Sequence, residues 1–162
     1  MYLHLLRKSF NNIQEGINKR YHINGKLQEE FIIVDGKCEG VYKSWSDNGT
    51  LVYQCKYVNG KPDGEVQVWY SSGKLMMSGN YVLGKREGKF LGYFDGVLNE
   101  EAHFQNDVLH GSYRCWENGI LTVEATFNKG KLHDDFREWK DGKMTRHIVY
   151  SEGNVKFIKS LL

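Results

Sequence analysis

Apolar side chains recur along this chain in three rows with a period of 23 or 24 residues. Each period starts at a glycine: Gly16, Gly40, Gly64, Gly88 and Gly111, with Asp134 in the sixth position. The first row is aromatic: Tyr21, Trp45, Trp69, Tyr93, Trp116 and Trp139. The second is aliphatic: Leu27, Leu51, Leu75, Leu98, Leu121 and Met144. The third is mostly aromatic: Ile33, Tyr57, Tyr81, Phe104, Phe127 and Tyr150. A fixed period of this length indicates an array of stacked supersecondary units.

Each unit is expected to be a β-hairpin. The segments between turns are rich in Val, Ile, Tyr, Phe and Trp, and pairs such as Asn-Gly and Asp-Gly supply the positive φ of hairpin turns. Two turns per unit predict an all-β fold: a single-layer, elongated, twisted antiparallel meander of six hairpin repeats. It would contain about a dozen strands spaced about 4.8 Å apart.

Two loop lengths explain the two periods. The 24-residue units have a three-residue first loop, such as Asp47-Asn48-Gly49, and the 23-residue units a two-residue loop, such as Asn118-Gly119. Both lengths place the first-row aromatic residue opposite the second-row aliphatic residue, which a one-residue slip would turn to the other face. The second turn has two residues in every unit.

A fourth row of apolar residues lies three residues before the first row: Tyr42, Val66, Phe90, Tyr113 and Phe136. Strict alternation places this row on the face opposite the first row. A bulge at the leading glycine would change how the strand joins the sheet and hence the side to which these residues point. The sequence therefore leaves the face of this row open.

The motif Y-x-x-G-K-x-x-G-x-x-x-x-W-x-x-x-G-x-L, complete from Tyr57 to Leu75, resembles the MORN repeat in the variant form found in bacterial and large-virus proteins. The resemblance extends from residue 16 to about residue 155. It departs from the motif in the first unit (Tyr21), in the fourth (Tyr93 and Val108) and at Asp134. The resemblance implies a single-layer β-meander that is usually a non-enzymatic interaction module. Some members are attached to catalytic domains, some are linked to phospholipid binding, and some bacterial relatives are named as antitoxins.

Composition limits the classes of partner and the cellular compartment that fit this sequence. A net charge of +2, from 22 basic and 20 acidic residues, gives no electrostatic footprint for nucleic acid and a weak one for anionic membranes. The three cysteines are widely spaced, which favours free or buried thiols in a reducing compartment. No apolar run reaches the length of a spanning helix, and the first residues do not resemble a signal peptide. We expect a cytoplasmic protein.

Residues 1–15 are predicted to form an N-terminal cap segment, and residues 16–162 a repeat array with units starting near 16, 40, 64, 88, 111 and 134. Leu3, Leu6, Phe10 and Ile13 have the spacing of one helical stripe. A cap covering the edge of the array is the preferred interpretation, and a membrane-surface or partner-binding helix is the alternative. The sequence does not decide between a helix and a strand.

Catalytic and metal-binding motifs are weak. Residues 79–86 match the phosphate-binding G-x-x-x-x-G-K pattern up to Arg86, but they also match the strand and turn of every other repeat. His110 and His133 are one repeat apart, about 10 Å, which is far for joint metal ligation. The acidic pairs Glu29-Glu30 and Glu100-Glu101 are three units apart. We therefore predict no enzyme activity, no cofactor and no metal.

The aromatic rows are the candidate binding site. The first and third rows are expected to share one face of the sheet, to stabilise it through cross-strand pairs and to leave exposed aromatic surface for a protein partner. The candidate partner-binding residues are Trp45, Trp69, Tyr93, Trp116, Trp139, Tyr57, Tyr81, Phe104 and Phe127. The favoured function is a non-catalytic protein–protein interaction scaffold, with antitoxin-like sequestration as one form of it. The alternative is a phospholipid-surface module. A homodimer through edge strands or termini is a further form of association.

Overall fold

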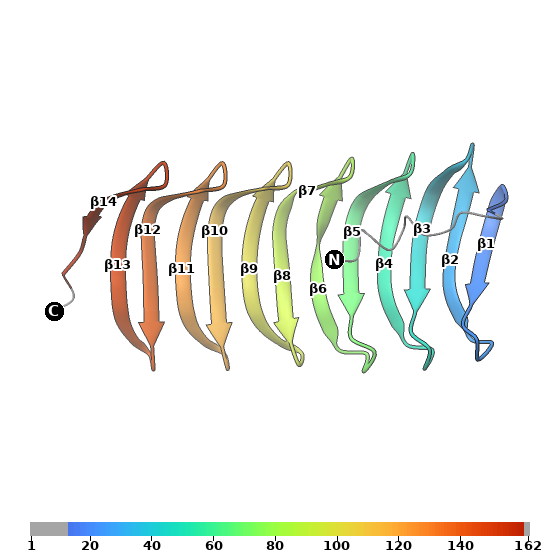
Figure 1. Ribbon diagram of the computed structural model, residues 1–162, viewed down its shortest axis with the longest axis horizontal. Coiled ribbons are helices and arrows are strands. Elements are labelled where there is room, and N and C mark those ends of the chain that lie inside the picture. The colour runs from blue at the N-terminus through green and yellow to red at the C-terminus, as the bar shows by residue number, and fades with distance from the viewer. Residues whose placement is uncertain (1–12, 161–162) are drawn as a thin grey trace.

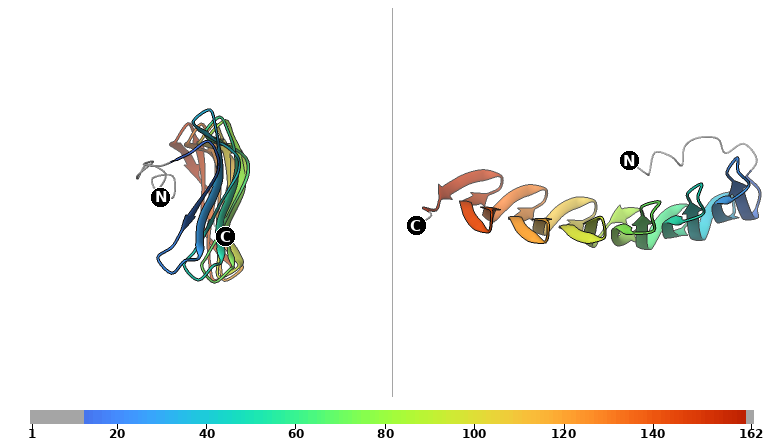
Figure 2. Two further views of the ribbon diagram at one scale, coloured as in Figure 1. Left: turned by 90° about the vertical axis from the view of Figure 1, so that its right-hand side faces the viewer. Right: turned by 90° about the horizontal axis from the view of Figure 1, so that it is seen from below.

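The chain forms one open antiparallel sheet in a computed structural model that describes residues 13–160 (Figure 1). Neighbouring strands follow chain order from β1 to β14, except that the short β7 pairs with β6 ahead of β8. The strands are β1 (Gly16–Tyr21), β2 (Leu27–Val34), β3 (Lys37–Trp45), β4 (Leu51–Val58), β5 (Lys61–Trp69), β6 (Leu75–Val82), β7 (Lys85–Arg86), β8 (Gly88–Phe94), β9 (Val97–Gln105), β10 (Val108–Glu117), β11 (Ile120–Asn128), β12 (Lys131–Lys140), β13 (Lys143–Ser151) and β14 (Asn154–Ile158). The predicted all-β, single-layer meander is confirmed. Seen end on, the sheet is one bowed layer (Figure 2).

The turns have the geometry that their residues predict. Asn118 and Gly119 have φ of 51° and 79°, and both residues of every second turn likewise have positive φ, as type I′ hairpins require. In the three-residue loops a glycine such as Gly49 has positive φ (94°), and its N–H donates to Ser46 O. These first turns lie at the lower margin in Figure 1, and the second turns lie at the upper margin.

The predicted register of the first two rows is also confirmed. Each first-row aromatic residue lies opposite a second-row aliphatic residue, as Trp45 does with Leu51 and Trp116 with Leu121. A register shift accompanies each of these pairs, because the aliphatic strand has one residue more than its partner. Such a bulge turns the side chains near it and increases the local twist.

The sheet has two chemically different faces. Strict alternation along the paired strands places Tyr42, Cys55, Tyr57 and Val66 on one face, which holds the buried apolar cluster and is called the core face. The opposite face has charged side chains along its middle in the C-terminal half: Glu101, Arg114, Glu124 and Arg137. It is called the ladder face. The fourth row, whose face the sequence left open, lies on the core face.

Adjacent repeats are also joined at their turns. At the second-turn margin a turn amide donates to a carbonyl of the preceding repeat, as Gly60 N does to Cys38 O (2.9 Å) and Gly84 N to Pro62 O (2.8 Å). At the first-turn margin a side chain donates to a carbonyl of the following repeat, as Asn48 Nδ2 does to Ser71 O (2.9 Å). The proposed N-terminal cap lies almost wholly outside the described residues, so the boundary between cap and array stays a prediction.

Candidate functional site

Large and small side chains alternate across the middle of the core face. Direct cross-strand neighbours follow one another from β3 to β13, and in most places a ring is followed by a small residue. The row consists of Tyr42, Cys55, Val66, Gly79, Phe90, Ala102, Tyr113, Ala125, Phe136 and Ile148. Gly79 shows why small residues are needed, because a Cβ there would lie 2.6 Å from Cγ of Phe90. Each ring therefore lies over a small neighbour, an arrangement that sequence analysis missed.

The fourth-row rings pack against the third row. Phe90 and Phe104 have ring centroids 5.4 Å apart, Tyr113 and Phe127 5.9 Å, and Tyr42 and Tyr57 5.8 Å. The first two pairs are edge-to-face, a geometry worth about 0.5–1.5 kcal/mol beyond area burial. Fourth-row and third-row rings thus pair within each of these repeats on the core face.

The first-row aromatics lie on the other face. Trp45 follows Ser44, which lies opposite Tyr53 on the core face, so Trp45 points to the ladder face and pairs there with Leu51. Tyr57 lies opposite Gly40 on the core face. The same relation holds in every later repeat. The candidate residues thus form two surfaces: Trp45, Trp69, Tyr93, Trp116 and Trp139 on the ladder face, and Tyr57, Tyr81, Phe104 and Phe127 on the core face. The sequence had placed them on one face, and a binding role for either set stays a prediction.

Burial of the core face differs between its two halves. In the N-terminal half Tyr42, Tyr57 and Val66 are buried. In the C-terminal half the corresponding large side chains are only half-buried: Tyr113, Phe127, Phe136 and Tyr150. Half-buried rings therefore lie over β10 to β13, and Tyr81 and Phe104 are half-buried nearer the middle of the sheet.

Burial also raises the pKa values of tyrosines and cysteines on this face. It raises the pKa of Tyr57 to about 12 and the pKa values of the Cys38 and Cys55 thiols to about 11. It raises the pKa of Tyr53 as well, and Tyr53 and Tyr57 share a hydrogen bond of 3.3 Å. These groups are neutral near pH 7 and serve as packing groups, because a thiol or phenol acts as a nucleophile through its anion.

Ion pairs hold the middle of the ladder face. Arg114 Nε lies 3.0 Å from Glu124 Oε1, and Arg137 Nη1 lies 2.8 Å from Glu124 Oε2. Partial burial raises the pKa of Glu124, but hydrogen bonds from both arginines outweigh it, so the pKa lies below its usual value. The Asp135 carboxylate binds His147 (2.6 Å) and Arg137 (2.7 Å), and the His147 bond is the main cause of its lowered pKa. Both carboxylates are therefore held in ion pairs, across strands to Arg114, Arg137 and His147 and within β12 between Asp135 and Arg137.

A row of side chains before the leading glycines supports the second turns. Asn59 N donates to Glu39 Oε2 (2.8 Å) and Asn106 N to Glu87 Oε2 (2.9 Å). In the fifth unit histidine replaces the carboxylate, and Lys129 N donates to His110 Nδ1 at 3.5 Å. These residues recur at the repeat period, a signal that sequence analysis did not use.

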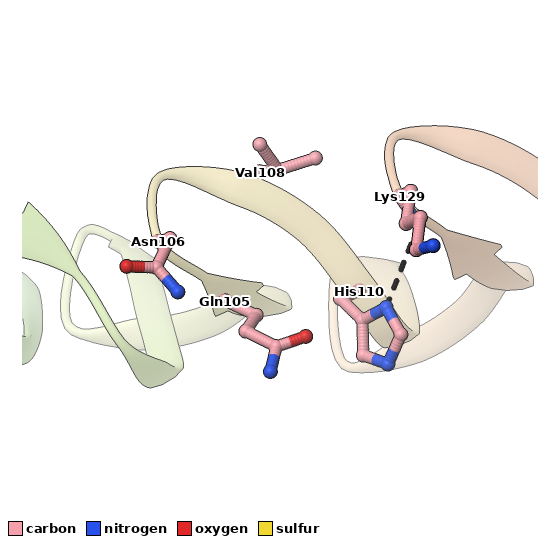
Figure 3. Close-up of a pocket in the computed structure, with 5 residues that line it drawn as sticks. All are labelled: Gln105, Asn106, Val108, His110 and Lys129. Carbon is pink, nitrogen blue, oxygen red and sulfur yellow. Dashed lines mark hydrogen bonds between the residues drawn. The ribbon is translucent and has the colours of Figure 1, made fainter.

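The His110 contact lies at a shallow hollow of about 230 Å³ at the second-turn margin. Its lining is Gln105, Asn106, Val108, His110 and Lys129 (Figure 3). The His110 side chain faces Lys129, while the two amides lie on the other side of the hollow (Figure 3). The lining brings no carboxylate beside the imidazole, so it does not supply a general acid–base pair.

Residues 79–86, which resemble a phosphate-binding loop in sequence, form the end of β6, a type I′ turn and β7. Within residues 13–160 no group of three or more His, Cys, Asp or Glu side chains is placed to hold a metal ion. The same residues include no helix of the length and apolar character needed to cross a membrane.

Comparison with known proteins agrees with this geometry. The family model described as MORN repeat variant matches residues 14–32, 39–59 and 62–82, which together are less than half of the chain. No curated protein matches the chain. The matched segments correspond to the hairpins from β1 to β6, and the later strands continue the same turns, register and ring rows. Three segments within residues 14–82 therefore match the MORN repeat variant, and the described residues fold as one open antiparallel β-sheet.

Proposed function

We propose that this chain is a non-catalytic scaffold that binds a protein partner on the core face over β10 to β13. The observation that carries the proposal is the half-burial of two ring pairs in neighbouring repeats on one face: Tyr113 with Phe127 and Phe136 with Tyr150. A contiguous apolar surface that a single-layer sheet leaves in contact with water is typical of an interaction site.

The chemistry of this surface suits a protein partner. Aromatic side chains in a partly dry setting are the usual anchors of protein interfaces, and a polar rim usually surrounds them. Such a rim is present at the first-turn side of the rings, where Arg146 Nη1 and Glu138 Oε2 form an ion pair of 3.1 Å on the same face. An apolar partner segment with polar flanks would match this pattern.

The MORN repeats support the non-catalytic part of the proposal, because proteins of this repeat family are generally scaffolds. Sequestration of a toxin protein, as in an antitoxin, is one form that such a scaffold can take. The rings would then occupy part of the toxin's surface and block its action by contact alone.

The ladder face offers the competing protein-binding surface, because Trp116 and Trp139 are half-buried there. Its middle is occupied by the paired charges of Arg114, Glu124 and Arg137, which a partner would have to desolvate. The core face has no such row between its rings in β10 to β13. We therefore favour the core face.

Substitutions on two neighbouring residues of β11 test the proposal. Phe127→Lys places a charge in the ring surface, and Thr126→Lys places the same charge on the ladder face one residue away. Trp116→Lys tests the competing surface. Proteins retained from a lysate of the source cell by each variant are compared by quantitative mass spectrometry, after circular dichroism has shown that the variants fold.

We expect Phe127→Lys to lose a protein that wild type, Thr126→Lys and Trp116→Lys all retain. Loss of the same protein by Trp116→Lys alone would move the site to the ladder face. Identical retention by all four proteins would refute a partner site on either aromatic surface.

A further inference from the structure

The chain has Asn-Gly pairs at exposed turns in several repeats. They are Asn24-Gly25, Asn48-Gly49, Asn59-Gly60 and Asn118-Gly119. An asparagine before glycine is chemically open to deamidation, because glycine has no side chain to obstruct the attack of its own amide nitrogen on the asparagine side chain. All four pairs are exposed to water. A difference in their reactivity must therefore come from the way in which the fold holds each turn.

The attacking nitrogen is hydrogen-bonded in three of the four pairs. The bonds are Gly25 N to His22 O (2.9 Å), Gly49 N to Ser46 O (2.8 Å) and Gly60 N to Cys38 O (2.9 Å). The first two close three-residue loops, and the third joins a second turn to the preceding repeat. Each of these bonds must break before the glycine nitrogen can turn toward the asparagine side chain.

Two of these asparagine side chains are held as well. Asn24 Nδ2 donates to Asp47 O (2.7 Å), and Asn48 Nδ2 donates to Ser71 O (2.9 Å), in each case in the following repeat. Asn48 Oδ1 also accepts a hydrogen bond from Thr50 N (2.9 Å). These bonds fix the carbonyl carbon that the nitrogen would attack.

The Asn118-Gly119 turn has neither kind of restraint. Within residues 13–160 no hydrogen bond involves the Gly119 N–H or the Asn118 side chain. The cause is the shorter loop, because a two-residue type I′ turn is closed by its flanking residues, here Glu117 and Ile120, and leaves its central glycine N–H in water. We propose that Asn118 is a deamidation site of the folded protein and reacts ahead of the asparagines in the other three pairs.

The reaction needs only water and a base. Base removes the Gly119 amide proton, and the nitrogen attacks Cγ of Asn118. The Cγ–Nδ2 bond breaks and ammonia leaves, which closes a five-membered succinimide between the two residues. Water then opens this ring at either carbonyl and gives aspartate or isoaspartate. The net change replaces a neutral amide with a carboxylate and releases one ammonia.

The two products differ in their fit to the turn. Asp95-Gly96 and Asp141-Gly142 occupy the corresponding turns of other repeats, and both aspartates have the φ of 51° that Asn118 has. An aspartate at 118 therefore suits the turn. In isoaspartate the main chain runs through the side chain and gains an additional atom, next to the pair of Trp116 and Leu121. This product should disturb the register of β10 and β11.

Peptide mass spectrometry in heavy-oxygen water tests the proposal. The folded chain is incubated at mildly alkaline pH, and the incorporated oxygen counts deamidation at each asparagine. A second sample in guanidinium chloride gives the rates without the fold. Carboxyl methylation by an isoaspartyl methyltransferase separates isoaspartate from aspartate. A variant with an aspartate inserted between Glu117 and Asn118 has the three-residue Asp-Asn-Gly loop of the second unit, and circular dichroism shows whether it folds.

We expect Asn118 to deamidate roughly fivefold or more faster than each of the other three in the folded chain, the factor by which one typical net hydrogen bond shifts a local opening. The four rates should converge in guanidinium chloride, and the insertion should slow Asn118 to about the rate of Asn48. Asn118→Asp should melt like the wild type, whereas the isoaspartate product should melt earlier. Equal rates in the folded chain, or the same order of rates in guanidinium chloride, would overturn the proposal. An unchanged Asn118 rate in the folded insertion variant would overturn it too.

Discussion

Replacement of Gly79 by alanine should destabilise the fold strongly, although alanine usually suits a strand better than glycine does. The new Cβ would overlap the Phe90 ring and lie 2.6 Å from its Cγ. The ring has little room to move, because it packs edge-to-face on Tyr81 (5.6 Å between centroids) and on Phe104 (5.4 Å). Relief of the overlap therefore disturbs both ring pairs.

The expected cost follows from these contacts. Overpacking of a filled site costs about 1–3 kcal/mol, and each weakened ring pair adds up to about 0.5–1.5 kcal/mol. We expect Gly79→Ala to lower the free energy of unfolding by about 2–4 kcal/mol. In a chain of this size that corresponds to a melting temperature lower by roughly 5–15 °C. The free energy is measured by urea denaturation followed by tryptophan fluorescence.

A double-mutant cycle identifies the cause. Phe90→Val removes the ring that the new Cβ would meet, so Gly79→Ala should cost close to nothing in that background. Ser78→Ala, on the same strand but on the ladder face, is the matched control and should change stability by less than about 0.5 kcal/mol. Additive effects of Gly79→Ala and Phe90→Val would refute the inference that small residues are required beneath the rings.

Three further predictions concern ionisation and loops. Because the folded-state pKa values of Glu124 and Asp135 lie below their ordinary values of 4.5 and 3.8, their contribution to stability is present above those values and is lost as the pH falls through the lower folded-state values. A flat stability curve in urea titrations over this acidic range would contradict it. Because burial raises the pKa of Tyr57, its neutral form stabilises the fold below about pH 10 and this contribution is lost at higher pH; phenolate absorbance should rise late and together with unfolding. Deletion of Ser72 turns a three-residue loop into a two-residue loop and should cost about 1 kcal/mol, whereas deletion of Val68 shifts the register of β5 and should prevent folding; equal thermal melts would contradict the loop assignment.

The sequence predicted most of the sheet because the residues at its turns indicate which turn each one forms. The residues Asn118-Gly119 and Asp47-Asn48-Gly49 each predict the type of turn that they form. With the turns fixed, the apolar rows allow one register, in which Trp116 lies opposite Leu121. The number of hairpins, their order and the antiparallel pairing all follow from these local signals.

The assignment of the aromatic rows to faces could not be predicted with the same certainty. Each hairpin has a register shift near its first turn, as β3 and β4 have beside Trp45. A second shift accompanies the leading glycine, as between Cys55 and Tyr57 in the pairing of β4 with β5. Each irregularity can reverse the alternation that a sequence argument relies on. The Trp69 row and the Tyr57 row were therefore joined on one face, although they lie on opposite faces.

Two other features were predictable in principle. The small residues beneath the rings, such as Gly79, Ala102 and Ala125, recur at the repeat period, and so do the turn acceptors, such as Glu39 and Glu87. They were missed because the repeats were aligned on their large apolar residues. The burial difference between the two halves goes with local neighbours: Tyr42 packs against the rings of Phe31, Tyr53 and Tyr57, whereas Tyr113 packs against that of Phe127.

The most direct test of the proposed function is site-specific photo-crosslinking. A benzoyl-phenylalanine is placed at Phe127 or Tyr150 on the core face, or at Trp116 on the ladder face, and each chain is irradiated in a lysate of the source cell. The account predicts that the two core-face positions form adducts with one and the same protein and that the Trp116 position does not. Adducts with that protein from Trp116 alone, or no protein common to Phe127 and Tyr150, would contradict the account.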